Sequence, residues 1–83
     1  MNAIIRVALK KTVLDPQGRA ITNALRSHGH REILSVRQGK YFEVELAPDE
    51  TAESARPKLE KVASEVLANP VIEDYQVEIL DRT

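Results

Sequence analysis

The chain begins with a segment in which apolar and polar residues alternate. Over residues 3–10, Ile5, Val7 and Leu9 share one side, and mostly polar residues share the other. A period of two places successive side chains on opposite faces of a strand. The pattern therefore predicts a half-buried β-strand over these eight residues.

A helix-start signal follows this strand. Asp15 can accept hydrogen bonds from the first free N–H groups of a helix, and Pro16 suits the first helical position, where its missing N–H costs nothing. Gly29 is typical of the left-handed residue that ends a helix. We therefore expect a helix from Pro16 to near His28 with a narrow apolar stripe. The stripe consists of Ala20, Ile21, Ala24 and Leu25.

The middle of the chain predicts a β-hairpin. Residues 33–46 are rich in β-branched and aromatic side chains, but Gln38-Gly39 interrupts them, and such a dipeptide can reverse the direction of the chain. We expect a strand on each side of this turn. The face of the second strand that we expect to be buried carries Phe42, Val44 and Leu46.

Helical spacing returns in the second half of the chain. The apolar residues that recur at this spacing are Ala55, Leu59, Val62, Ala63, Val66 and Leu67. Pro57 would remove a hydrogen bond from a helix interior, so we expect the regular helix to start near Ser54 and to end at Asn69-Pro70. Residues 73–80 alternate again and predict a last strand.

The order of elements is therefore strand, helix, strand, strand, helix, strand. The simplest packing of this βαββαβ order is an α+β two-layer sandwich, with a four-stranded antiparallel sheet and two helices on one face. The 83 residues suit a single domain spanning 1–83. So small a core gains little stability over its conformational entropy, and a partner subunit is the supplement that we expect.

Composition and charge exclude several classes of protein. Twelve Lys and Arg against thirteen Asp and Glu give a net charge of −1, which argues against a nucleic-acid-binding domain. No apolar run approaches the roughly 20 residues of a membrane span, and the N-terminus lacks the apolar region of a secretory signal, so the cytoplasm is the expected location. With no Cys and only two His, neither a disulfide nor a zinc site is expected.

No catalytic constellation is visible in the sequence. No Ser or Thr stands out as a nucleophile with a positioned base. The three glycines, Gly18, Gly29 and Gly39, are too far apart to form one phosphate-binding loop. His28 and His30 are explained by a favourable position at the negative end of a helix. The residues therefore predict a domain that binds no metal or cofactor and has no active site of its own.

Three blocks of the sequence are distinctive when they are taken together. They are Val13-Leu14-Asp15-Pro16-Gln17-Gly18, Val36-Arg37-Gln38-Gly39-Lys40-Tyr41-Phe42-Glu43 and Leu67-Ala68-Asn69-Pro70-Val71-Ile72-Glu73-Asp74-Tyr75. In this order they resemble the PurS family, the small subunits of formylglycinamidine ribonucleotide (FGAM) synthase. The resemblance covers nearly the whole chain.

The resemblance implies a non-catalytic subunit of a glutamine-dependent, ATP-dependent C–N ligase of de novo purine biosynthesis. Such a subunit bridges the synthetase PurL and the glutaminase PurQ and assists the transfer of ammonia between them. ATP, magnesium and glutamine would be used by these partners and not by this chain. The resemblance also implies a homo-oligomer, either a dimer or a tetramer.

Two groups of residues are candidates for contacts with partners. The first group lies around the predicted turn and comprises Arg37, Gly39, Lys40 and Tyr41. The second lies at the predicted helix start and comprises Asp15, Pro16 and Gly18. Turn geometry could account for the glycine of the first group, and helix capping could account for the whole second group.

Three other functions remain open from the sequence alone. An ACT-like regulatory module that binds a small ligand uses the same order of elements, but its ligand loop would want glycine directly after the first strand, and none occurs before Gly18. An independent small enzyme would need a cleft with convergent titratable groups. RNA binding would show a steep dependence on salt.

Overall fold

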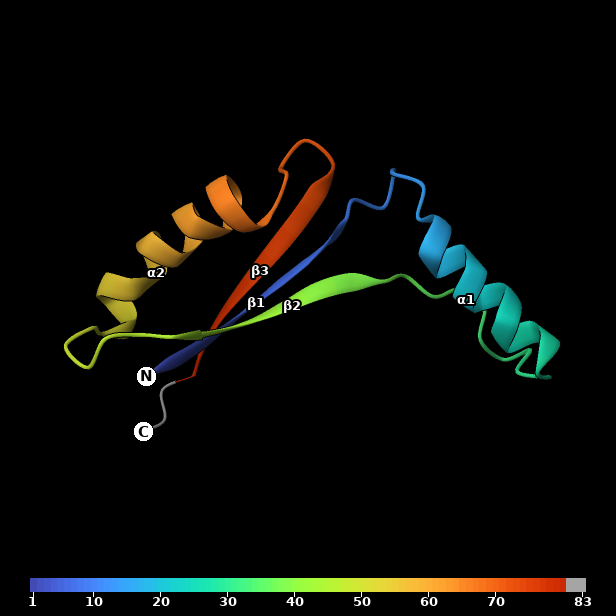
Figure 1. Cartoon of the computed structure of the whole chain (residues 1–83), viewed down its shortest axis with the longest axis horizontal. Coiled ribbons are helices and arrows are strands. Elements are labelled where there is room, and N and C mark those ends of the chain that lie inside the picture. The colour runs from blue at the N-terminus through green and yellow to red at the C-terminus, as the bar shows by residue number, and fades with distance from the viewer. Residues whose placement is uncertain (81–83) are drawn as a thin grey trace.

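The computed structural model describes residues 1–80. Along the chain it contains the strand β1, the helix α1, the strand β2, the helix α2, one π-helical turn η1 and the strand β3 (Figure 1). Their bounds are Asn2–Leu9, Pro16–Ser27, Gly39–Glu45, Ala52–Val62, Ala63–Leu67 and Glu73–Leu80. The strands form an antiparallel sheet in the order β2-β1-β3, so the first strand of the chain lies in the centre.

The core lies between the sheet and α2. Ile5 and Val7 on the central strand are fully buried, as their alternation with polar residues predicted. Leu59 on α2 is only 4% exposed and packs against them, together with small alanines. The partly buried residues around this cluster include Phe42, Val44, Leu46, Tyr75, Val77 and Ile79. The face of β2 that was predicted to be buried, with Phe42 and Val44, is therefore confirmed.

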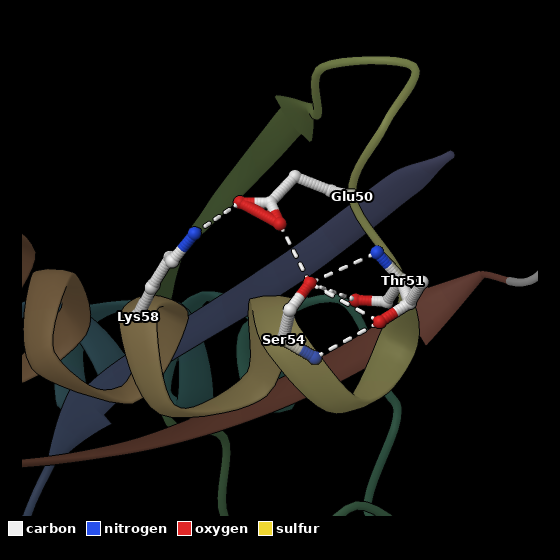
Figure 2. Close-up of polar contacts among 4 residues, drawn as sticks. All are labelled: Glu50, Thr51, Ser54 and Lys58. Atoms are coloured by element: carbon white, nitrogen blue, oxygen red, sulfur yellow. Dashed lines mark hydrogen bonds and ion pairs between the residues drawn. The ribbon is translucent and has the colours of Figure 1, made fainter.

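Helix α2 begins with a reciprocal capping arrangement (Figure 2). The Thr51 hydroxyl accepts from the Ser54 N–H at 3.1 Å, and the Ser54 hydroxyl accepts from the Thr51 N–H at 3.0 Å. The carboxylate of Glu50 accepts from Lys58 and from the Ser54 hydroxyl, each at 2.6 Å. These two donors, Lys58 above all, lower the pKa of Glu50. The Glu50 carboxylate in turn raises the pKa of Lys58.

This capping corrects the predicted start of the helix. The helix begins at Ala52 and not near Ser54, and Pro57 lies in its interior. Pro57 has no N–H to donate to the carbonyl of Glu53 one turn earlier. The capping hydrogen bonds of Thr51 and Ser54 fix a first turn that begins two residues before the predicted start, and the helix continues through Pro57.

The predicted four-stranded sheet with both helices on one face is wrong, because within residues 1–80 the sheet has three strands and α1 lies beyond their end. Residues 30–38, here called the return segment, form no strand and run beside α1. The Val36 N–H donates to the Thr22 hydroxyl at 2.9 Å, and the Gln38 N–H donates to the Asp15 carboxylate at 2.9 Å. Side chains of the α1 region thus take backbone donors that a neighbouring strand would have used.

Residues 10–38, here called the arm, stand apart from the sheet. Figure 1 shows α1 beyond the end of the strands, whereas α2 lies along the sheet. Within residues 1–80, α2 and η1 are the helical elements that pack against a strand. The radius of gyration is 16.2 Å, whereas a compact chain of this length would have about 12 Å. The chain is therefore extended along its length, with principal dimensions of 50 × 29 × 14 Å.

Candidate partner-contact surface

The arm meets the sheet at a junction built around Asp15. One carboxylate oxygen of Asp15 accepts from the Gly18 N–H at 3.0 Å and caps α1, as the sequence predicted. The other oxygen accepts from the Gln38 N–H at 2.9 Å. One side chain therefore fixes both the start of the helix and the end of the return segment, immediately before β2 begins.

Two backbone N–H donors stabilise the charged form of this carboxylate. They lower the pKa of Asp15 below its ordinary value of 3.8, the Gln38 donor contributing most and the Gly18 donor next. The guanidinium of Arg37 adds a smaller effect of the same sign. Asp15 is therefore ionised at neutral pH, in the form that holds the junction closed.

Gly18 allows the return segment to approach the helix closely. A Cβ at this position would lie 2.3 Å from the carbonyl oxygen of Val36 and 3.0 Å from the Cα of Arg37. Four residues further along the same helix, the Thr22 hydroxyl donates to the Gly18 carbonyl at 2.8 Å and accepts from the Val36 N–H. Glycine is thus required here by space, because Val36 lies against the backbone of α1.

Arg37 holds the connection between β1 and α1. Its Nη2 atom lies 2.9 Å from the Lys10 carbonyl oxygen, 3.2 Å from that of Val13 and 3.3 Å from that of Leu9. These three carbonyls lie at and just after the end of β1, so one cation links the return segment to that end of the strand. Three of the chain's own carbonyls therefore hold the Nη2 atom of this guanidinium.

The remaining predicted residues lie at the start of β2. Gly39 pairs with Ala8, and a Cβ there would lie 2.6 Å from the Val7 carbonyl oxygen. Lys40 extends to Glu73 at 3.7 Å. Tyr41 is 56% exposed and lies opposite Arg6, on the side of the sheet away from α2.

The structure therefore divides the seven predicted residues into two groups. One group forms the junction and comprises Asp15, Pro16, Gly18, Arg37 and Gly39. The other group, Lys40 and Tyr41, lies on β2 with substantial exposure. The predicted turn at Gln38-Gly39 is wrong, because Gly39 is the first residue of β2. Helix capping, close backbone approach and hydrogen bonds to the chain's own backbone account for the first group, and Tyr41 stays exposed.

Two surfaces extend beyond the seven predicted residues. The first is the side of the sheet away from α2, here called the open face. Its members are Asn2, Ile4, Arg6, Ala8, Tyr41, Glu43, Glu45, Asp74, Gln76 and Glu78. The second is the exposed apolar surface of the arm, which includes Leu14 and Leu34 at 69% and 76% exposure. The signal for the second was the narrow stripe of the first helix, too narrow for a helix covered by a sheet.

Neither surface has the groups of a metal site. Within residues 1–80 no cluster of three or more His, Cys, Asp or Glu side chains is placed to hold a metal ion. The same residues contain no helix with the length and apolar character of a membrane span. What these surfaces offer chemically is apolar contact area bordered by charge.

Comparison with known proteins shows the family of this chain. The PurS model, phosphoribosylformylglycinamidine (FGAM) synthase, matches residues 2–81. The chain belongs to the PurS family. It is 45% identical over 76 residues to the PurS subunit of phosphoribosylformylglycinamidine synthase from Mycobacterium leprae, covering 92% of this chain and 91% of that subunit. It is 39% identical to the Bacillus subtilis PurS subunit, covering 90% and 87%.

Solved PurS structures share the fold. PurS of Methanocaldococcus jannaschii superposes with a TM-score of 0.87 at 32% identity, over 99% of this chain and 98% of that one. A chain of the PurLQS structure from Thermotoga maritima matches with a TM-score of 0.75 at 32% identity, over 95% of each chain. The resemblance inferred from the three sequence blocks is therefore confirmed, and the ACT-like alternative loses its support.

Proposed function

We propose that this chain is the small subunit of an FGAM synthase of purine biosynthesis, where it bridges a PurL synthetase and a PurQ glutaminase and assists ammonia transfer. The observation that carries the proposal is the similarity, over 95% of both chains, to a chain of the PurLQS structure from Thermotoga maritima. Matches to PurS subunits over at least 90% of this chain, as in Mycobacterium leprae and Bacillus subtilis, support the same role.

In this role the chain supplies contacts and no reacting group. ATP, magnesium and glutamine are handled by PurL and PurQ, in the cytoplasm, and this chain forms a homodimer or homotetramer within the assembly. Its shape supports the proposal, because an arm that leaves its own sheet provides two surfaces for other chains to cover. A single domain spanning residues 1–83 is sufficient for such a role.

The predicted contact residues have two different tasks in this proposal. Tyr41 and Lys40 contact a partner directly from β2. Asp15, Gly18 and Arg37 are positioning residues, because their hydrogen bonds and close approach set the direction of the arm. Pro16 and Gly39 belong to the same junction.

A reconstitution tests the proposal. PurL and PurQ of the same organism are run on size exclusion with and without this chain, in the presence of ATP, magnesium and glutamine. Synthase turnover is then measured with glutamine and, separately, with free ammonia. We expect the three chains to co-elute and glutamine-dependent turnover to require this chain, while ammonia-dependent turnover by PurL persists without it. Equal glutamine-dependent turnover in its absence would contradict the proposal.

A further inference from the structure

The arm contains a hollow with a basic lining. The hollow lies between α1, the return segment and the connection from β1, and its volume is about 580 Å³. Within residues 1–80 its lining has a single carboxylate, that of Asp15, and both oxygens of this carboxylate already accept from backbone N–H groups. The lining also has four cations, which are Lys11, Arg19, Arg26 and Arg37. Like charges around one hollow repel each other, so a bound anion would stabilise this arrangement.

Helix α1 builds one wall of the hollow. The residues of the helix that line it are Arg19, Thr22, Asn23 and Arg26. Their spacing of i, i+3, i+4 and i+7 places them on one face of the helix. The two arginines are about 10.5 Å apart along the helix axis, so the side chains of both can reach an anion bound midway between them. The sequence of α1 contains no Asp or Glu, so no carboxylate on this helix neutralises the two arginines.

The chain's own contacts leave donors of the hollow free. Among the described residues, Lys11 and Arg19 form neither an ion pair nor a side-chain hydrogen bond. Arg26 donates through Nη2 to the Leu34 carbonyl oxygen at 3.2 Å, which holds this guanidinium between the helix and the return segment. Arg37 is likewise held through Nη2 by three carbonyls. The hollow therefore has two cations in fixed positions and two that are available to a ligand.

The surroundings of these cations favour a small phosphorylated molecule. Arginine and lysine groups bind phosphate oxygens through charge-assisted hydrogen bonds. Leu14 and Leu34 line the same hollow at 69% and 76% exposure and offer apolar contact to the organic part of such a molecule. The volume lies within the range of small-molecule sites, about 300–1,000 Å³. A nucleic acid is disfavoured, because outside the arm the chain has six Lys and Arg against eleven Asp and Glu, which repel a long polyanion.

We propose that the hollow of the arm is a binding site for a small phosphorylated molecule. Lys11 and Arg19 bind its phosphate group, and the two leucines contact its organic part. The other two cations contribute positive charge from the walls. Because the ligand touches α1, the return segment and the connection from β1 at once, binding should hold the arm closed. This site is independent of the bridging role in the proposed function.

A titration of the full chain tests the site. Amide chemical shifts are followed by NMR while inorganic phosphate, adenosine 5′-monophosphate (AMP) or adenosine is added, and sodium chloride at equal ionic strength is the reference. We expect saturable shifts of N–H groups in the arm with phosphate and with AMP. AMP should bind more tightly than phosphate, because its organic part contacts the leucines, and adenosine should not bind. The proposal is overturned if neither phosphate nor AMP gives saturable shifts, if sodium chloride gives the same shifts, or if adenosine binds as tightly as AMP.

Paired variants test the two free cations. Lys11→Gln with Arg19→Gln should raise the dissociation constant of AMP at least about tenfold, since each charge-assisted hydrogen bond contributes about that factor. Arg56→Gln with Lys61→Gln is the matched control, because it removes the same charge from α2 and should leave the constant unchanged. Before AMP is added, both variants should exchange the Val36 N–H within about twofold of wild type, which shows an intact arm.

Hydrogen exchange tests whether the ligand holds the arm closed. In wild type, AMP at ten times its dissociation constant should slow exchange of the Val36 N–H about elevenfold, because an open arm no longer holds the parts of the site together. The proposal is overturned if this exchange does not slow, if Lys11→Gln with Arg19→Gln binds AMP like wild type, or if the control on α2 weakens binding equally.

Discussion

Replacing Gly18 by alanine tests whether close packing at the junction fixes the arm. The added Cβ would lie 2.3 Å from the Val36 carbonyl oxygen and 3.0 Å from the Cα of Arg37. Both are backbone atoms, so the return segment must move by about 1 Å to reach ordinary van der Waals distance. Such a shift pulls the Val36 N–H away from the Thr22 hydroxyl, which now lies at 2.9 Å.

Gly18→Ala has two opposing effects on the stability of the closed arm, a gain in helix propensity and a packing cost, and the packing cost is the larger. Alanine is favoured over glycine within a helix by about 1 kcal/mol. Overpacking costs about 2 kcal/mol, and the lost hydrogen bond of Val36 about 1 kcal/mol more. We therefore expect Gly18→Ala to destabilise the closed arm by about 2 kcal/mol, which is a factor of about 30 in the opening equilibrium.

Amide hydrogen exchange followed by NMR measures this opening directly. The Val36 N–H should exchange about 30-fold faster in Gly18→Ala than in wild type, while the N–H groups of β1 keep their protection because the sheet opens separately. Asn23→Ala is the matched control: it raises helix propensity on an exposed position of the same helix, and should slow exchange slightly. Slower Val36 exchange in both variants would refute the packing argument, since propensity alone would then decide the outcome.

Three further predictions follow from the junction and the core. Folding of the arm lowers the pKa of Asp15 below 3.8, so the stabilisation that the ionised carboxylate gives is present above pH 3.8 and is lost as the pH falls through the pKa of the folded state. Exchange of the Gln38 N–H, measured against pH, should show this loss. In Asp15→Asn the pH dependence should be absent. Arg37→Lys should speed exchange of the Val13 N–H about fivefold, because an ammonium does not reproduce the three carbonyl contacts. Leu59→Ala should cost about 3 kcal/mol and lower the Tm by more than about 10 °C in thermal unfolding, whereas a fall of similar size in the exposed control Val71→Ala would contradict the assigned core.

Local signals predicted those elements whose residues carry their own pattern. The alternation around Ile5 and Val7 gave the central strand, and residues 73–80 match β3 in full. Asp15-Pro16 and Gly29 bound α1, with Gly29 at φ 89°. In each case neighbours in sequence provide the decisive interaction, so the sequence is sufficient.

The return segment could not be predicted, because its partners are distant in sequence. Ile33 and Val36 have the β-branched side chains of a strand, but strand propensity depends on having a neighbouring strand to pair with. The Val36 and Gln38 N–H groups are instead bound by Thr22 and Asp15, 14 and 23 residues earlier. The sequence shows that Asp15 can cap a helix, but it gives no sign that the same carboxylate also accepts from the Gln38 N–H.

The same limit applied to the contact surface. Arg37 looked like a cation available to a partner, but its Nη2 atom is held by the chain's own carbonyls. Glu43 and Glu45 alternate with Phe42 and Val44 in the sequence, and in the structure they lie on the open face. The two-layer packing predicted from the sequence already left one face of the sheet uncovered, but only the structure shows that the arm stands away from the sheet as well.

The fixed direction of the arm is best explained by association with another chain. Among residues 1–80, half of the buried core residues are alanines, namely Ala3, Ala55 and Ala63. The sheet, α2 and η1 therefore form a small core to which the arm contributes no buried residue. An arm outside the core could take many directions at little cost. The carboxylate of Asp15, the missing side chain at Gly18 and the guanidinium of Arg37 nevertheless fix one direction. That direction has a consequence only when another chain meets the arm, which is why folding and association should be coupled in this protein.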